Sequence, residues 1–235
     1  MNLLALDTST EQMSIAVQCR GQTAPWLHTA AGGALTSTHL IPQIQALMGQ
    51  AQLRFDELDA VVFGAGPGSF TGLRTACSVA QGLAFGAGLL VLPVDSLLAV
   101  AEEARVQLNA ADGFRVTALL DARMDEMYVA SYTFYSGKWI NDKGYSLIKP
   151  ENLILDDSHV LAGNVFAAYG TRFAGGSAPR VNALPTAAAL LRLAPALQAA
   201  GAAVAPQHAL PTYIRDKVAQ TTQERAAIKS AAVPP

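Results

Sequence analysis

Two aspartates, each at the end of a short apolar run, are the residues of this sequence best suited to chemistry. Asp7 opens the turn "DTST" and Asp121 opens "DARMDEM". If the two hairpins faced each other across a cleft, their aspartates could hold a magnesium-nucleotide, since Mg²⁺ is bound by one or two carboxylates together with phosphate oxygens. The small hydroxyl residues after Asp7 suit that role. Arg123 and Met124 stand where small residues would let a phosphate approach the backbone, so ATP turnover is not expected.

A glycine-rich loop, "GAGPGSFTG" at residues 64–72, is the second candidate site. A strand, a loop of glycines and a helix start would aim backbone N–H groups at an anion. The loop has no P-loop lysine, and Ser69 stands where a dinucleotide-binding loop needs its third glycine. We expect no cofactor and at most weak nucleotide binding. The predicted anion- or nucleotide-binding residues are Asp7, Thr8, Ser9, Gly66, Gly68, Ser69, Thr71 and Gly72.

The segment after this loop repeats small residues at helical spacing. Ala76, Ala80, Ala84 and Gly88 recur every fourth residue, which leaves one stripe of a helix almost without side chains. Such a stripe lets the helix approach a neighbour closely. That neighbour is either the protein's own sheet or helix, or a helix of another subunit. Phe70 at the loop tip is then an exposed apolar anchor or a buried plug.

Metal and nucleophile sites find little support in the sequence. His39 lies near the start of a predicted helix, but Gln43 occupies the position one turn later where a metal pair needs a second histidine. The other histidines show no ligand spacing, so no metal site is predicted. Ser69 and Cys77 have no recognisable base nearby in sequence, and no catalytic nucleophile is predicted.

The composition points to a protein partner. Of the 235 residues, 51% are hydrophobic and only 14% are charged, against about 25% charged in an average globular chain. A surface so poor in charge suggests cover by another subunit. The formal net charge is −2 without a basic cluster, so nucleic acid is contacted only indirectly. Two unpaired cysteines and a start without signal-peptide features predict a cytoplasmic protein, with no membrane association.

The elements that position these residues follow from apolar periodicity. We predict strands at 2–6, 13–18, 59–64, 144–148 and 158–163. Predicted helices cover 36–50, 73–85, 96–108 with Ser96 as cap, 150–155 and 186–197.

An internal similarity suggests duplication. "LALDTSTEQMSIAV" aligns without a gap on "ALLDARMDEMYVAS", pairing Asp7 with Asp121 at an offset of 114 residues. Two such openings imply a duplicated α/β architecture with a cleft between the halves. The alternative is chance similarity between two short hairpins. We predict an N-terminal lobe at 1–108, a C-terminal lobe at 109–218 and a flexible tail at 219–235.

Five motifs together resemble the TsaB (YeaZ) family. They are "LALDTST", "THLIPQI", "GPGSFTGLR", "DARMDEMY" and "PTYIRDKVA", which span Leu3 to Val218. The resemblance implies the two-lobed α/β fold of actin, Hsp70 and sugar kinases (the ASKHA fold) in a bacterial cytoplasmic protein. It also implies a non-catalytic scaffold that assists threonylcarbamoyladenosine formation next to the anticodon of tRNA.

The same resemblance implies the partners. The related TsaD carries the metal-binding histidines and the transfer chemistry, and the ATPase TsaE docks on the pair. The first predicted helix and the helix after Gly72 would form the face that pairs with TsaD, or with a second copy of the chain as a homodimer. The implied interface residues are His39, Leu40, Gln43, Leu47, Phe70, Leu73, Ala76, Cys77, Ala80 and Ala84.

Two other functions remain open at this point. One is an ATP-dependent phosphotransferase or ATPase of the same fold, in which Asp7 orients magnesium and the glycine-rich loop holds phosphate. The other is a metallopeptidase, which ranks last because the sequence has no HExxH run.

Overall fold

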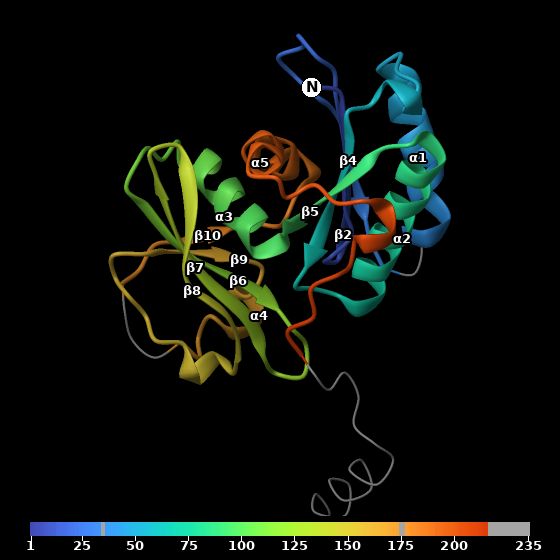
Figure 1. The fold of residues 1–235 in the computed structure, drawn as a ribbon. Coiled ribbons are helices and arrows are strands. Elements are labelled where there is room, and N and C mark those ends of the chain that lie inside the picture. Colours follow the sequence, from blue (N-terminus) through green and yellow to red (C-terminus); the bar gives the residue numbers. More distant parts are fainter. Residues whose placement is uncertain (34–35, 174–176, 216–235) are drawn as a thin grey trace, which may run out of the picture.

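Two five-stranded sheets face each other across a layer of helices in the computed structural model, which describes residues 1–33, 36–173 and 177–215 (Figure 1). The elements of the first half are β1 (Leu3–Asp7), β2 (Gln12–Gln18), β3 (Trp26–Ala31), α1 (Thr36–Gln50), η1 (Phe55–Glu57), β4 (Ala60–Gly66), α2 (Phe70–Ala87), β5 (Leu90–Asp95) and α3 (Ser96–Gln107). Those of the second half are β6 (Phe114–Asp121), β7 (Met127–Tyr135), β8 (Lys138–Ile148), η2 (Pro150–Asn152), β9 (Val160–Gly163), α4 (Phe166–Tyr169), β10 (Arg180–Asn182), α5 (Ala187–Ala199) and η3 (Pro206–His208).

The two sheets share one topology. The first has the order β3-β2-β1-β4-β5 and the second β8-β7-β6-β9-β10. In each, the leading strand pairs antiparallel with the next strand and parallel with the fourth. Asp7 pairs with Ser14 and Asp121 with Met127, so each aspartate ends its leading strand. The predicted duplication is therefore confirmed, and chance similarity of two hairpins is excluded.

Helices cover both faces of the first sheet. Leu4 and Leu6 point into a core shared with α1 and α2, whereas Leu3 and Ala5 point into a core shared with α5. This strand is apolar on both faces, as expected for one buried between two helical layers. It is fully buried along its length, which places Asp7 at the end of an inaccessible strand.

The second sheet uses α3 as the cover of its inner face. Ala118 and Leu120 pack in the same core as Leu97 and Val100 of α3. A smaller core on the outer face includes Leu119, beneath the segments around η2 and α4. The helices α3 and α5 also contact each other, and α3 contacts strands of both sheets (Figure 1).

Several predicted boundaries need correction. The helix expected at 73–85 starts at Phe70, because Ser69 accepts a hydrogen bond from the amide of Gly72 and caps it. The cap of α3 is Asp95 and not Ser96, since the carboxylate of Asp95 accepts from the Leu97 amide. The helix predicted at 150–155 is wrong: only the short turn η2 forms there.

The proposed division into lobes remains a prediction. α5 comes from the second half of the chain but packs on β1, β2 and β4 of the first sheet. The predicted tail at 219–235 lies outside the described residues. Within the described ranges, no helix is long and apolar enough to cross a membrane.

Candidate functional site

A cleft of about 520 Å³ lies where the two lobes meet. The turn after β1 and the first turn of α2 form its first-lobe wall. The β6–β7 turn, Asn164 and the C-terminal residues 212–215 form the rest. Four of the eight predicted anion-binding residues line this cleft, namely Ser9, Gly68, Ser69 and Thr71. The two hairpins with similar sequences thus line the same cavity, as expected.

Asp7 does not face this cleft, which corrects its predicted role. Its side chain is fully buried, and Oδ1 accepts hydrogen bonds from the amide (2.8 Å) and the hydroxyl (2.7 Å) of Ser9. Oδ2 has no hydrogen-bond partner among the described residues. Burial raises the pKa of Asp7 to about 6, against the opposing effect of the Ser9 hydrogen bonds. Asp7 therefore shapes the turn beneath the cleft wall.

The glycines of the loop are explained by the first hairpin. A Cβ at Gly72 would lie 1.8 Å from the carbonyl oxygen of Thr8, and one at Gly68 would lie 2.4 Å from that of Ser9. The Ser69 amide donates to the Ser9 carbonyl at 2.7 Å, and the Thr8 hydroxyl donates to the Gly72 carbonyl at 2.7 Å. Backbone therefore packs on backbone, which only glycine permits. Gly72 and Thr8 are used within the chain and do not line the cleft.

Gly66 also serves the fold. Its φ is +111°, and a Cβ there would lie 2.8 Å from the carbonyl oxygen of Thr212. The Thr212 amide in turn donates to the Ala65 carbonyl at 2.7 Å. This glycine makes room for the C-terminal segment rather than for a ligand.

The second hairpin fills its side of the cleft with its own side chains. Asp121 accepts hydrogen bonds from the Arg123 amide (2.8 Å), the Arg123 guanidinium (3.1 Å) and the Tyr169 hydroxyl (3.1 Å). Arg123 and Met124 both line the cavity, at the positions where the sequence predicts that they obstruct a phosphate. Both have positive φ although neither is glycine. Asp121, whose carboxylate would have to bind a metal ion in this cleft, is thus already hydrogen-bonded to residues of its own lobe.

The predicted partner face needs a larger correction. Seven of its ten residues are buried within the chain, so they cannot contact a partner directly: Leu40, Leu47, Leu73, Ala76, Cys77, Ala80 and Ala84. The small-residue stripe packs in the core shared with β1, β4 and α1, so its neighbour is the protein's own structure. His39 is exposed, Gln43 is half-buried and Phe70 is 37% exposed. These three remain candidates for a partner surface.

Other residues of the same helices do reach the surface. Phe85 of α2 is 80% exposed, and Ile41 of α1 is also exposed. A Cβ at Gly82 or Gly86 would meet no described atom within 4 Å apart from its chain neighbours and the backbone of its own helix, so this side of α2 is open. The two helices therefore expose apolar side chains at positions that the small-residue pattern did not select.

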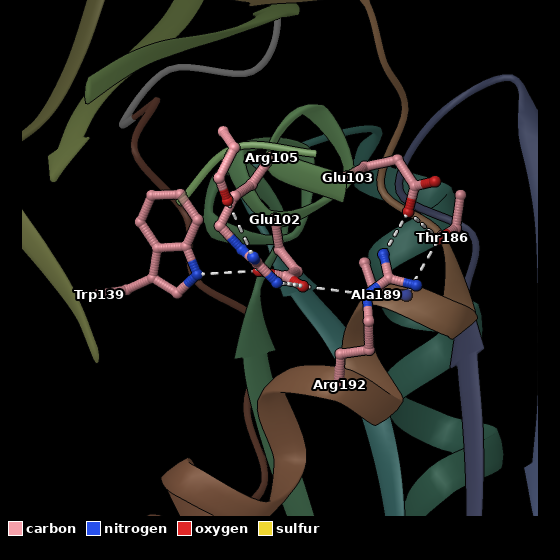
Figure 2. A network of polar contacts seen from close by, with 8 residues as sticks. Glu102, Glu103, Arg105, Trp139, Thr186, Ala189 and Arg192 are labelled. Carbon is pink, nitrogen blue, oxygen red and sulfur yellow. Dashed lines mark hydrogen bonds and ion pairs between the residues drawn. The ribbon is translucent and has the colours of Figure 1, made fainter. Parts of the chain in front are cut away.

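An ionic network centred on the buried carboxylate of Glu102 links α3 to α5 and was not predicted from the sequence (Figure 2). The carboxylate of Glu102 accepts from Arg105 at 2.9 Å, from Arg192 at 3.0 Å and from the Trp139 indole at 3.1 Å. Burial opposes ionisation of Glu102, but the hydrogen bonds from Arg105 and Trp139 outweigh it and hold its pKa below the usual value. The sequence signal was three charged residues, Glu102, Glu103 and Arg105, in a helix that begins as an apolar run.

A second missed contact joins the two sheets directly. The hydroxyls of Tyr132 on β7 and Tyr145 on β8 both donate to Oδ2 of Asp95, which ends β5. Because β5 belongs to the first sheet and the tyrosines to the second, this contact holds the lobes together. No local pattern marks such a pairing, since the residues are 37 and 50 positions apart.

Comparison with known proteins places the chain in a family. The family model of TsaD, tRNA N6-adenosine threonylcarbamoyltransferase, matches residues 33–229. The tRNA threonylcarbamoyladenosine biosynthesis protein TsaB of Haemophilus influenzae is 33% identical over 93% of this chain and 95% of its own length. The Escherichia coli protein of the same name is 32% identical over 93% of this chain and 96% of its own.

A solved structure agrees in fold. YeaZ from Pseudomonas aeruginosa superposes with a TM-score of 0.82 at 35% identity, covering 91% of this chain and 99% of that one. Together with the duplicated sheets, this confirms the two-lobed ASKHA fold that the motifs implied. The chain belongs to the TsaB (YeaZ) family.

Proposed function

We propose that this protein is a non-catalytic subunit required for the threonylcarbamoyladenosine modification of tRNA next to the anticodon. The relatives named for that pathway, which match nearly the whole chain, support the proposal. The protein would pair with a TsaD-like catalytic subunit and with a TsaE-like ATPase, and would form a homodimer when isolated. It would act in the cytoplasm and contact tRNA only through its partners.

The main support for a non-catalytic role is that neither aspartate of the two hairpins is free to bind a metal ion in the cleft. Asp7 is sealed beneath the first hairpin, and Asp121 is bonded to Arg123 and Tyr169. To hold a magnesium-nucleotide in this cleft, the two carboxylates would have to be free to bind the ion. Here both carboxylates serve the chain itself. The cleft would hold at most a weakly bound nucleotide.

The exposed side of α1 and α2 supports the proposed pairing. Phe85 and Ile41 leave apolar surface uncovered on these two helices, and a partner helix could approach the open backbone at Gly82. Burial of aromatic surface at the centre of an interface contributes much of the binding energy in protein complexes. The TsaD-like subunit, or a second copy, would cover this side.

Mixing the protein with the TsaD subunit of its own organism, followed by light scattering, tests the proposal. A complex with the summed mass is expected at micromolar concentration. Phe85→Arg should abolish it, because a charge buried in an apolar contact is costly unless it is paired. Ile154→Arg is the matched control: Ile154 is 91% exposed in the second lobe, so its variant should still pair. Separate peaks from the unmodified proteins would contradict the pairing.

The alternative of an ATP-dependent phosphotransferase or ATPase is tested on the isolated protein. Calorimetric titration with Mg-ATP and a turnover assay are expected to show weak binding at most and no hydrolysis. Tight binding with turnover that Asp7→Asn abolishes would overturn the non-catalytic role and favour the alternative.

A further inference from the structure

The C-terminal residues 209–215, here called the strap, run from the first lobe to the second. The strap leaves η3, crosses the N-terminal half of α2 and reaches the β6–β7 turn, as the orange to red segment in Figure 1 shows. Four of its residues, 212–215, line the interlobe cleft. It is therefore both a wall of the cleft and a physical link across it.

On the first lobe the strap is held at both its backbone and its side chains. Ala209 is fully buried, and its carbonyl accepts a hydrogen bond from Gln81 of α2 at 2.9 Å. The Thr212 amide donates to Ala65 at 2.7 Å, beside the glycine that leaves room for it.

An aromatic contact continues this anchoring at the mouth of the cleft. The ring of Tyr213 lies 5.6 Å from that of Phe70, and the guanidinium of Arg74 donates to the Tyr213 hydroxyl at 3.2 Å. The same guanidinium stacks 4.0 Å from the Phe70 ring. These contacts are partly exposed, so water competes for them more readily than for the buried Ala209.

On the second lobe Arg215 holds the β6–β7 turn. Its guanidinium donates to Glu126 at 2.6 Å and to the carbonyl of Arg123 at 3.4 Å, and it contacts the sulfur of Met124 at 3.0 Å. Its side chain is only 12% exposed. One residue of the strap thus touches three of the four residues from 123 to 126.

The turn that Arg215 holds has an unfavourable backbone. Arg123, Met124 and Asp125 have φ values of 60°, 53° and 65°, so three successive residues with a Cβ adopt the left-handed conformation. In that conformation the Cβ crowds the following carbonyl oxygen. Such conformations persist only where surrounding contacts impose them, and they occur at switch regions. Arg172 supplies a second contact, through Asp125, from within the same lobe.

We propose that the strap is a releasable latch for the second hairpin. Arg215 holds the β6–β7 turn in its left-handed form, and lifting the strap from α2 lets the turn relax and opens the cleft on that side. The latch concerns a motion of the chain itself and does not depend on the proposed role in tRNA modification.

Hydrogen–deuterium exchange tests the hold on the turn. The amides of Ala122 and Glu126 bond across the turn to the carbonyls of Glu126 and Arg123, so they report its closure. In Arg215→Met they should exchange at least tenfold faster, with no change in the β1–β2 hairpin. Arg20→Met, which removes an exposed arginine paired with Asp59 on the first lobe, is the control and should leave the turn unchanged.

A double-variant cycle separates the strained turn from simple packing. Arg123→Gly relieves one left-handed position and keeps the backbone carbonyl that Arg215 contacts, so Arg215→Met should accelerate exchange at Ala122 and Glu126 less in that background than in the wild type. An equal effect in both backgrounds would contradict the claim that Arg215 opposes backbone strain. Faster exchange throughout the protein would show that Arg215 supports the whole fold, which also overturns the latch.

Opening of the cleft is measured by thiol labelling. Ala122 lines the cleft and is nearly buried, so Ala122→Cys, with Cys19 and Cys77 replaced by serine and alanine, reports access to it. Tyr213→Ala, which loosens the strap without touching the turn, should raise the labelling rate at least fivefold. An unchanged rate would mean that the strap does not control access to the cleft.

Discussion

Asp7 and Gly64 lie in contact on the neighbouring strands β1 and β4, so closely that a Cβ at position 64 would be 1.8 Å from Oδ2 of Asp7. The glycine is required by the carboxylate beside it. Because Asp7 is fully buried and held by Ser9, it cannot turn away to make room.

Gly64→Ala should therefore destabilise the protein by about 1–3 kcal/mol, because it overpacks a closed core. The measurement is urea unfolding of the variant against the wild type. Gly82→Ala is the control: it adds the same methyl group on the open side of α2, where the helix preference for alanine predicts a gain of about 0.5–1 kcal/mol. Equal stability of the Gly64→Ala variant and the wild type would show that the Asp7 side chain can move to accommodate the added methyl group.

The titration of Asp7 predicts an unusual dependence of stability on pH. Its pKa rises from an ordinary 3.8 to about 6 in the folded protein because of burial. A raised pKa means that folding favours the protonated acid. The stabilisation is therefore complete below pH 4 and is lost as the pH rises through 6, by about 3 kcal/mol in total.

Asp7→Asn isolates this effect, because the amide does not titrate. Relative to the wild type, the variant should gain stability between pH 4 and pH 7, as followed by urea unfolding at each pH. Other carboxylates, such as Asp59, have lowered pKa values and give the opposite dependence in both proteins, so they cancel in the comparison. A difference that stays constant from pH 4 to pH 7 would refute the shift.

The duplicated fold was predictable because its signal is local and occurs twice. Each leading strand is a buried apolar run that ends in an aspartate, at matching positions of the two halves. The strands β3, β5 and the three-residue β10 were not predicted. β3 alternates only between half-buried and exposed positions, and the Leu90–Asp95 strand contains a proline. A strand without buried positions, or one that contains a proline, is hard to recognise from sequence.

The site was predictable only in part, because the decisive contacts join distant residues. The sequence correctly predicted that the two hairpins and the glycine-rich loop lie at one cleft. It did not predict that the Asp7 side chain is buried and does not face that cleft. Likewise, four-residue spacing marks the Ala76 stripe without saying whether sheet or partner covers it. The strap shows the same limit: Arg215 and Glu126 are 89 residues apart, and only the fold brings them into contact.

Glu102 should be among the residues most sensitive to substitution in this protein. Glu102→Ala would leave Arg105, Arg192 and the Trp139 indole without their shared acceptor (Figure 2). Arg105 and Arg192 are 24% and 34% exposed and Arg192 keeps its bond to Glu103, so the loss of the buried acceptor should cost about 1–3 kcal/mol. Asp56→Ala, which breaks an exposed pair with Arg54, is the control and should unfold like the wild type in urea. A Glu102→Ala variant of equal stability would show that the arginines find other acceptors.

The contact of Asp95 with Tyr132 predicts how the lobes unfold. Tyr132→Phe removes a buried donor and should cost about 1–3 kcal/mol, since the carboxylate of Asp95 then keeps fewer partners. The sequence has two tryptophans, Trp26 on β3 and Trp139 on β8, so single-tryptophan backgrounds report one sheet each. Because the lost bond joins the sheets, Tyr132→Phe should separate the two fluorescence transitions in urea. Tyr135→Phe, at an exposed tyrosine of the same strand, should leave them coincident, and coincident transitions in Tyr132→Phe would mean that other contacts suffice to couple the lobes.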